Sequence, residues 1–305
     1  MPVVRHGISS VDAQTMRAIR EALGKAPKFR FEPASRAAYD QIIAQAPAPA
    51  TVTFESGEVG GVPGWWCRPA HSPDRTVVLY LHGGGYVMGS ASAYRNFVGR
   101  IAEQAQATTF IADYALAPER PFPAAMNDLR ALHEGLLTRG YERMALAGDS
   151  AGAGLALSFL TGKATRPDRI AGVAAMSPWI DLSLSGESMA SRESDDPLLS
   201  KSALEEAATF YVGGQNSRDS LVSPLNDEIS TLPPVRIHVG DAEVLLDDSL
   251  RFTRRADRAG VNCETHVWEG MIHVFPSNFA ILEAAAAAVE DIGAFLAGLL
   301  GAPRP

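Results

Sequence analysis

The sequence predicts an α/β fold, in which a largely parallel sheet carries helices on both faces. From Thr76 onward, short apolar runs alternate with longer segments that have the periodicity of helices. Between one apolar run and the next helical segment lies Gly148-Asp149-Ser150-Ala151-Gly152. This G-x-S-x-G pattern is typical of a sharp turn from strand to helix, and it predicts that Ser150 stands at an edge of the sheet, within reach of a substrate.

Composition excludes several classes of partner. The chain has 305 residues, of which 46% are apolar, so it can bury a substantial core. Its 27 basic and 35 acidic residues give a net charge of −8, without a Lys/Arg cluster that would follow a phosphate backbone, so no nucleic-acid partner is expected. Cys67 and Cys263 are too few and too far apart for a disulfide framework or a zinc site, and we expect both to be buried.

The two ends of the sequence bear on localisation. Residues 1–7 lack a basic start followed by an apolar core, so no secretory signal is expected and a cytoplasmic protein is the default. The apolar stretch from Phe279 to Leu300 contains Glu283, Glu290 and Asp291. Because a membrane span would strongly disfavour these charges, the stretch is predicted to be a surface helix, without stable membrane association.

The first elements are two amphipathic helices, predicted over Ser10–Leu23 and Pro33–Ala46. They either pad the core or lie over a site as a lid. A hairpin of strands over Thr51–Ser56 and Val62–Arg68 follows, with glycines at its turn.

The rest of the chain alternates between strands and helices. Strands are predicted at Thr76–Leu81, Thr108–Asp113, Tyr141–Ala147, Ile170–Ser177, Pro234–Gly240 and Val261–Trp268, the last at the edge of the sheet, and helices at Ala93–Gln106, Ala124–Arg139, Ala151–Thr161 and Ser202–Tyr211. The polar segment Pro178–Asp196 is too long for an ordinary connection. Together with the helix that follows, it can fold over the carboxyl ends of the strands, where open α/β sheets bind ligands.

The strand Thr76–Leu81 leads directly into His82-Gly83-Gly84-Gly85. Three consecutive glycines can simply form a flexible turn. Beside a strand-to-helix serine they also suit a loop whose exposed N–H groups receive a negative oxygen. We expect His82 to orient this loop by hydrogen bonding and not to act as a base.

Residues for nucleophilic catalysis occur in a suitable order. A serine hydroxyl needs a base within hydrogen-bond reach, and the base needs a carboxylate to orient it. His273 alone among the seven histidines lies in a loop flanked by glycine after Ser150 and outside a predicted strand. The acids that follow the strand Pro234–Gly240 are Asp241, Glu243, Asp247 and Asp248. Serine, acid and histidine in this order are typical of α/β-hydrolases.

Several motifs together resemble one family, the bacterial esterases similar to mammalian hormone-sensitive lipase, in the branch that carries GDSAG. This branch lies near short-chain esterases and monoterpene lactone hydrolases. The resemblance covers nearly all of Thr76 to Phe275. It rests on His82–Gly85, Asp113-Tyr114-x-Leu-Ala-Pro-Glu119, Gly148–Gly152, Ser177-Pro178-Trp179 with Asp181, and Gly270-Met-x-His273-x-Phe275.

The resemblance implies an α/β-hydrolase fold with a mostly parallel, eight-stranded sheet and a helical cap. The cap would comprise residues 1–50 and an insertion at about 180–220, and residues 51–305 would form the catalytic domain. The resemblance also implies an oxyanion hole made by the N–H groups of Gly84, Gly85 and Ala151. It implies acyl transfer in two steps, with neither a cofactor nor a metal, and it favours a homodimer.

The sequence departs from the family at the acid position. Family members usually have Asp-Pro-Leu there, and the matching residues are Glu243-Val244-Leu245. Glutamate can orient an imidazole as aspartate does, so Ser150, His273 and Glu243 are the expected catalytic residues. Asp241 and Asp247 are the lesser candidates, and we expect Asp247 and Asp248 to cap the following helix or to meet solvent.

The predicted function is that of a serine carboxylesterase for short-to-medium acyl esters, because a cap over the strand ends leaves a bounded pocket. Hydrolysis of lactones by the same mechanism is an alternative. A non-catalytic small-ligand receptor is an alternative of another class, and the presence of His273 argues against it. The position of Val261–Trp268 at the sheet edge is a further reason to expect a homodimer.

Overall fold

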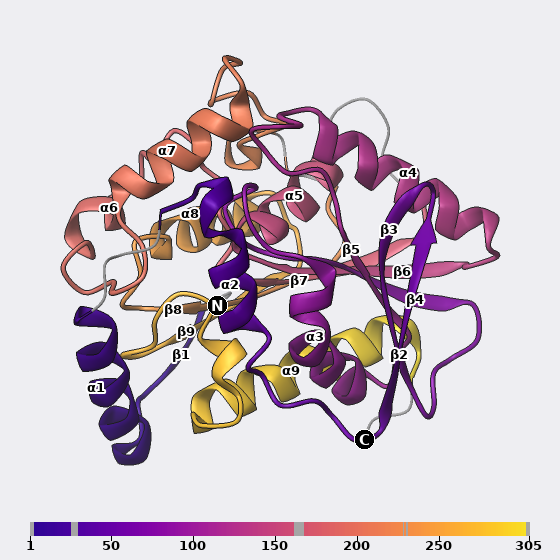
Figure 1. Ribbon diagram of the computed structural model, residues 1–305, viewed down its shortest axis with the longest axis horizontal. Helices are drawn as coiled ribbons and strands as arrows, with labels where there is room; N and C mark the ends of the chain where they lie inside the picture. Colours follow the sequence, from indigo (N-terminus) through magenta and orange to yellow (C-terminus); the bar gives the residue numbers. More distant parts are fainter. Residues whose placement is uncertain (1–2, 26–29, 162–167, 228, 230, 303–305) are drawn as a thin grey trace.

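The computed structural model describes residues 3–25, 30–161, 168–227, 229 and 231–302, and a twisted sheet runs through its centre (Figure 1). Within these residues, nine strands pair in the order β1-β9-β8-β7-β6-β4-β5-β3-β2. Strand β3 alone among them runs against the others, so the sheet is mostly parallel. The strands are β1 (Val3–His6), β2 (Val52–Val59), β3 (Val62–Pro69), β4 (Thr76–Leu81), β5 (Thr109–Ala112), β6 (Arg143–Asp149), β7 (Ile170–Met176), β8 (Val235–Gly240) and β9 (Cys263–Trp268).

Helices cover both faces of the sheet, as parallel strands require (Figure 1). α3 and α9 pack on one face, and α4, α5 and α8 pack on the other. The helices are α1 (Ser10–Gly24), α2 (Arg36–Ile43), α3 (Ala91–Ala105), α4 (Ala124–Thr138), α5 (Ser150–Thr161), α6 (Ser188–Ser191), α7 (Lys201–Val212), α8 (Leu246–Arg258) and α9 (Glu283–Leu300), with 3₁₀ turns at Pro33–Ser35, Pro224–Asn226 and Phe275–Asn278.

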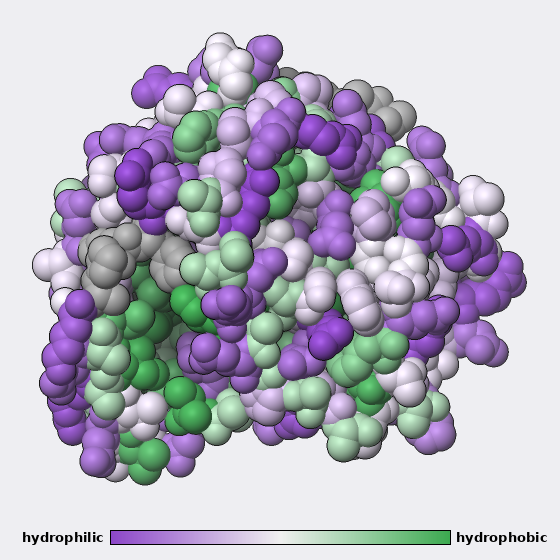
Figure 2. Space-filling model, viewed as in Figure 1, coloured by the Kyte–Doolittle hydropathy of each residue, from purple (hydrophilic) through white to green (hydrophobic). Residues whose placement is uncertain are grey.

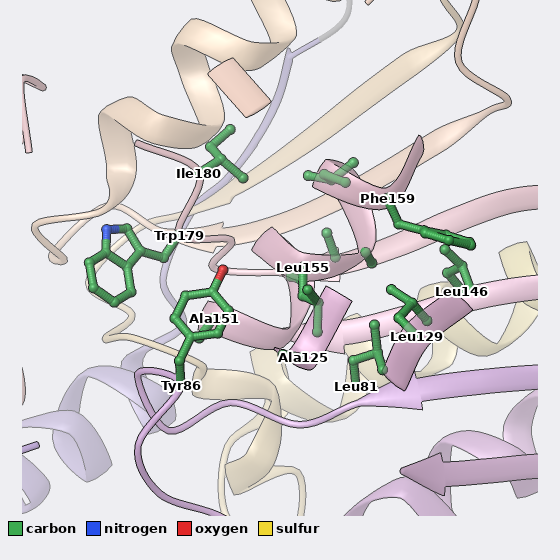
Figure 3. Packing of buried hydrophobic residues seen from close by; sticks show 14 of the residues in the cluster. Leu81, Tyr86, Ala125, Leu129, Leu146, Ala151, Leu155, Phe159, Trp179 and Ile180 are labelled. Atoms are coloured by element: carbon green, nitrogen blue, oxygen red, sulfur yellow. The ribbon is translucent and has the colours of Figure 1, made fainter. Parts of the chain in front are cut away.

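Strand β4 explains why the central strands are continuous apolar runs in the sequence. Its side chains alternate between two cores, because successive residues of a strand point to opposite faces. Leu79 and Leu81 lie in the core under α4 and α5, whereas Val78 and Tyr80 lie in the core under α3 and α9. Figure 3 shows Leu81 beside the side chains that α4 and α5 contribute to the first of these cores.

Strand β1 was not predicted from the sequence. Val3–His6 pairs in parallel with Thr265–Trp268 of β9, which gives nine strands where eight were expected. Residues 3–6 therefore belong to the sheet and not to a helical cap segment. The expectation that Val261–Trp268 forms the sheet edge is wrong for the same reason, because β1 covers β9. A four-residue strand is too short to show a periodicity, and its partner is about 260 residues away.

The C-terminal helix packs on the sheet as a surface helix, and it covers only part of the predicted apolar stretch from Phe279 to Leu300. α9 begins at Glu283 and not at Phe279, because residues 279–281 form a turn after the 3₁₀ turn at 275–278. Val289, Ile292 and Leu296 of α9 lie in the core that it shares with α3. No helix in the described part of the chain is long and apolar enough to cross a membrane.

Candidate active site

Ser150 stands on a strained turn at the carboxyl end of β6. It is the first residue of α5, and its φ of 50° lies in the left-handed region. A non-glycine residue adopts this conformation rarely, and such strain is typical of a serine on a strand-to-helix turn. Gly152 lets the turn form, because a Cβ on it would collide with the carbonyl oxygen of Leu81 in β4. The turn predicted from the G-x-S-x-G pattern is thus present.

Three of the residues predicted to form the site are joined by hydrogen bonds. His273 Nε2 lies 2.9 Å from Ser150 Oγ, and His273 Nδ1 lies 2.7 Å from Glu243 Oε2. Because a carboxylate only accepts, Nδ1 carries the proton and Nε2 is left free to accept from the serine hydroxyl. Ser150 is 6% exposed, His273 9% and Glu243 not at all, so the carboxylate is shielded from water while the serine and the histidine both border the pocket.

The surroundings of His273 favour its protonated form. Burial alone would lower the pKa of the ring. The hydrogen bond to Glu243 and the charges of Glu243, Asp196 and Asp149 outweigh burial and hold the pKa of His273 above its ordinary value of 6.5. A base whose protonated form is stabilised in this way can accept a proton from a hydroxyl more readily.

Glu243 is fixed through its second oxygen. Oε1 accepts hydrogen bonds from Ser177 Oγ and from the backbone N–H of Gly240, each at 2.8 Å. The hydroxyl of Ser177 also accepts from the N–H of Val274, beside His273, at 3.0 Å. Ser177 therefore connects the carboxylate to the histidine loop. Ser177 belongs to the Ser177-Pro178-Trp179 motif, but this role was not predicted from the sequence. Its place directly after β7 was the available signal.

The other three acids of this region are engaged elsewhere. Asp241 Oδ1 accepts from the N–H of Gly270 at 2.7 Å, and Asp247 Oδ2 accepts from the N–H of Ser188 at 2.9 Å. Asp248 is fully buried, and its Oδ2 accepts from the N–H groups of residues 180 and 181 at 2.9 and 3.0 Å. The expectation that Asp248 meets solvent or caps its own helix is wrong, because its carboxylate accepts from backbone N–H groups of the segment after β7. Burial raises the pKa of Asp248 to about 8.

The glycine loop, residues 82–90, lies between β4 and α3, beside the serine. Gly84 has a φ of 111°, and a Cβ on it would collide with the carbonyl oxygen of Met88, so a glycine is required there. The carbonyl of Gly84 accepts from the N–H groups of Val87 and Met88 at 3.1 and 2.9 Å, which closes the loop into a tight turn. Ala151 lies in the first turn of α5, where N–H groups have no partner within the helix.

Two buried side chains hold the beginning of the glycine loop. His82 Nδ1 lies 2.8 Å from the carbonyl oxygen of Gly83, in agreement with the expected orienting role. Asp149 is buried beside Ser150, and its Oδ1 accepts from the N–H of Gly83 at 3.0 Å and from the hydroxyl of Tyr80 at 2.8 Å. The same carboxylate thus connects the serine turn to the glycine loop. This role of Asp149 was not predicted from the sequence.

A pocket of about 460 Å³ opens onto Ser150 and His273. Its lining is largely apolar and comes from segments far apart in the sequence. Ile19 of α1 and Ile42 of α2 contribute to it, as does Leu198 of the segment between β7 and α7. Figure 2 shows hydrophobic residues gathered in a hollow beside α1. The N-terminal helices therefore line the pocket, and α1 also packs on the core, since its Met16 belongs to the same buried cluster as Trp268 and Phe275.

Beyond the pocket, one further group of side chains in the described residues could in principle hold a metal ion. His238, His266 and Asp291 place ligand atoms within 4.8 Å of one another. The guanidinium of Arg236 already binds both oxygens of Asp291 and lies 3.2 Å from Glu264. The guanidinium of Arg236 thus supplies the positive charge in this cluster. The cluster forms an ion-pair network between β8, β9 and α9.

Comparison with known proteins agrees with this geometry. Residues 78–277 match the family described as alpha/beta hydrolase fold. The chain is 38% identical over 242 residues to an acetyl-hydrolase of Streptomyces hygroscopicus, and the aligned residues cover 78% of this chain and 80% of the relative. It is 33% identical over 270 residues to an esterase of Acinetobacter venetianus, and here the aligned residues cover 87% of this chain and 89% of the relative. A crystal structure of an esterase from the bacterial hormone-sensitive lipase family superposes with a TM-score of 0.88 at 37% identity, over 96% of this chain and 99% of that one.

Proposed function

Since the chain belongs to the α/β-hydrolase fold family, among the esterases related to bacterial hormone-sensitive lipase, we propose that Ser150, His273 and Glu243 catalyse the hydrolysis of short-to-medium acyl esters. The observation that carries this proposal is the hydrogen-bonded series from Glu243 through His273 to Ser150, which ends in an apolar pocket.

The proposed reaction is acyl transfer in two steps. Ser150 Oγ attacks the ester carbonyl while His273 Nε2 takes the hydroxyl proton, and Glu243 stabilises the imidazolium that forms. The N–H groups of Gly84, Gly85 and Ala151 receive the negative oxygen of the tetrahedral intermediate. His273 then gives its proton to the departing alcohol, which leaves an acyl group on Ser150. Water, deprotonated by His273, attacks this acyl group, and His273 returns the proton to Ser150 Oγ as the acid is released.

The pocket supports the choice of substrate. A volume of about 460 Å³ lies in the range of small-molecule sites and is bounded on several sides. No Lys or Arg occurs among the described residues that line it, and Asp149 is the one carboxylate there. These features favour uncharged, largely apolar esters with an acyl chain of up to about eight carbons. Lactones meet the same conditions and belong in the substrate panel.

The proposal extends to the localisation, the domain division and the oligomeric state of the protein. We place the chain in the cytoplasm and without stable membrane association. We also divide it into a catalytic domain (51–305) and a cap, which consists of the N-terminal segment after β1 and the insertion at about 180–220. A homodimer is proposed on the resemblance alone, because β1 covers the strand that was expected to pair. Sedimentation that detects only monomer at micromolar concentration would exclude the dimer.

The test is hydrolysis of a panel of esters and lactones by the purified protein and by Ser150→Ala. We expect p-nitrophenyl butyrate to be cleaved faster than long-chain triglyceride emulsions. Ser150→Ala should lower the rate by several orders of magnitude while the circular dichroism spectrum is unchanged, because the nucleophile is lost. Residual turnover above about a thousandth of the wild-type rate would show that another group attacks the ester. A receptor without catalytic activity would instead bind panel members and hydrolyse none.

A further inference from the structure

Helix α2 binds the glycine loop and its surroundings through one face. Arg36, Tyr39 and Asp40 are spaced i, i+3 and i+4, so their side chains leave the helix on the same side. Each of them contacts a different point on the segment from residue 87 to residue 94, which runs from the glycine loop into α3. The ring of Tyr39 also lines the pocket, together with Ile42 and Ile43 of the same helix.

Arg36 holds the far side of the loop. Its Nε donates to the carbonyl oxygen of Val87 at 2.7 Å, and its Nη2 donates to the carbonyl oxygen of Ala117 at 2.9 Å. The N–H of Ala117 in turn donates to the carbonyl of Tyr86 at 2.8 Å. The guanidinium is itself oriented by Glu119, at 2.7 and 2.9 Å. Two consecutive loop carbonyls, those of Tyr86 and Val87, are therefore fixed by one arrangement around Arg36.

Asp40 and Tyr39 hold the end of the loop and connect it to the serine. Asp40 Oδ2 accepts from the hydroxyl of Ser90, the N-cap of α3, at 2.8 Å. The hydroxyls of Tyr39 and Tyr94 lie 2.7 Å apart, and Tyr94 donates to Asp149 Oδ2 at 3.0 Å. Because Tyr94 uses its proton on Asp149, Tyr39 is the donor to Tyr94.

The carboxylate at the end of this series is the one that binds the N–H of Gly83. A continuous hydrogen-bonded path thus runs from α2 through Tyr94 and Asp149 to the first glycine of the loop. Burial raises the pKa values of Tyr39 and Tyr94, so both hydroxyls keep their protons and can donate. The glycine loop is held by α2 at Val87, Ser90 and, through this path, Gly83.

We propose that α2 is a positioning element of the reaction, which holds the N–H groups of Gly84 and Gly85 where the negative oxygen develops. This inference rests on the proposed function. Glycine-rich backbone has little intrinsic preference for one conformation, so the donors need an external brace to be preorganised. Since the brace does not touch the substrate carbonyl, its loss should weaken binding of the transition state and leave binding of the neutral substrate unchanged.

The test uses Tyr39→Phe, which removes one hydroxyl and keeps the ring, and Arg36→Gln, which removes the guanidinium. For p-nitrophenyl butyrate we expect kcat to fall about tenfold in each, with KM within about twofold, because the donors are displaced and not deleted. Tyr141→Phe is the matched control, since Tyr141 stacks on Trp66 just before the other end of β6. It should keep the wild-type kcat. Arg36→Lys, which keeps the charge and one donor direction, should recover part of the loss.

A second measurement separates positioning of the loop donors from shaping of the pocket. An alkyl trifluoromethyl ketone adds to a catalytic serine and places a negative oxygen among the loop donors, whereas the matching methyl ketone stays neutral. We expect the variants to bind the trifluoromethyl ketone more weakly, by the same factor as the loss in kcat, and to bind the methyl ketone as the wild type does.

Two outcomes would show that the proposal is wrong. If both variants lower the melting temperature but keep kcat within twofold, α2 only stabilises the fold and the proposal is wrong. It is equally wrong if both ketones bind more weakly by the same factor, because α2 then shapes the pocket. If Arg36→Gln does not fold, Tyr39→Phe decides alone. Failure of the wild type to hydrolyse any ester would instead overturn the proposed function, and the two failures are therefore distinguishable.

Discussion

The side chains around His273 show why an unusual acid can occupy the family's acid position. Glutamate has one more methylene than aspartate, which costs side-chain freedom unless both oxygens are held. Here one oxygen meets the imidazole, and the other is held by Ser177 and by the N–H of Gly240. The longer side chain is thus anchored at both carboxylate oxygens, and Glu243 can orient the ring as firmly as a shorter acid would.

Glu243→Gln should impair catalysis strongly. The amide keeps nearly the same volume, but it carries no charge to stabilise the imidazolium and favours the wrong tautomer. We expect kcat to fall by roughly two to four orders of magnitude for p-nitrophenyl butyrate. Asp247→Asn is the control, because Asp247 binds the N–H of Ser188, and it should do much less. If Asp247→Asn or Asp241→Asn were the crippling change and Glu243→Gln were active, the acid would have to be reassigned.

Among the elements, the sheet strands were the most predictable from sequence and the cap contacts the least. β4 and α4 begin at Thr76 and Ala124, as predicted, because a buried strand or an amphipathic helix carries its own periodicity. Contacts such as Tyr39 with Tyr94 depend on where two distant segments meet, and they leave no local pattern. The role of Ser177 was missed for the same reason, since its partner Glu243 lies 66 residues away.

The pairing of β1, β9 and β8 places an ionisable network beside α9. His238 is fully buried in β8, accepts from the indole N–H of Trp268 at 3.2 Å through Nδ1, and donates to Asp291 through Nε2 at 2.9 Å. Both ring nitrogens are therefore satisfied in the neutral form. Burial lowers the pKa of His238 to about 4, although Asp291 acts in the opposite direction. The charged or titratable groups that surround it are His6 of β1, Arg236 of β8, Glu264 and His266 of β9, and Asp291 of α9.

This network predicts a loss of stability in mild acid. Below pH 6.5 the unfolded chain protonates His238 and the folded chain does not until about pH 4, so unfolding becomes more favourable as the pH falls through this window. The contribution is roughly 2 kcal/mol between pH 7 and pH 5. Urea unfolding at the two pH values should show a larger drop for the wild type than for His238→Gln. An equal drop in both proteins would mean that His238 does not carry the effect.

The whole molecule combines a sheet that could be predicted with an enclosure that could not. The order of strand, turn, serine, acid and histidine along the sequence is sufficient to bring Ser150, Glu243 and His273 to one edge of a parallel sheet, because each follows a strand that ends there. The pocket is different, since its lining joins α1, α2 and the segment before α7. Its shape follows from tertiary packing, so the acyl preference depends on the structure more than on any motif.

The central claim is that Ser150 is a nucleophile activated by His273 and Glu243, and covalent labelling tests it most directly. The purified protein is treated with a fluorophosphonate and digested, and its peptides are analysed by mass spectrometry. The account predicts one phosphonyl group per chain, on Ser150, with no adduct in Ser150→Ala and slow labelling in Glu243→Gln, because only an activated serine attacks phosphorus rapidly. A wild-type protein that stays unlabelled, or one labelled at another residue, would contradict it.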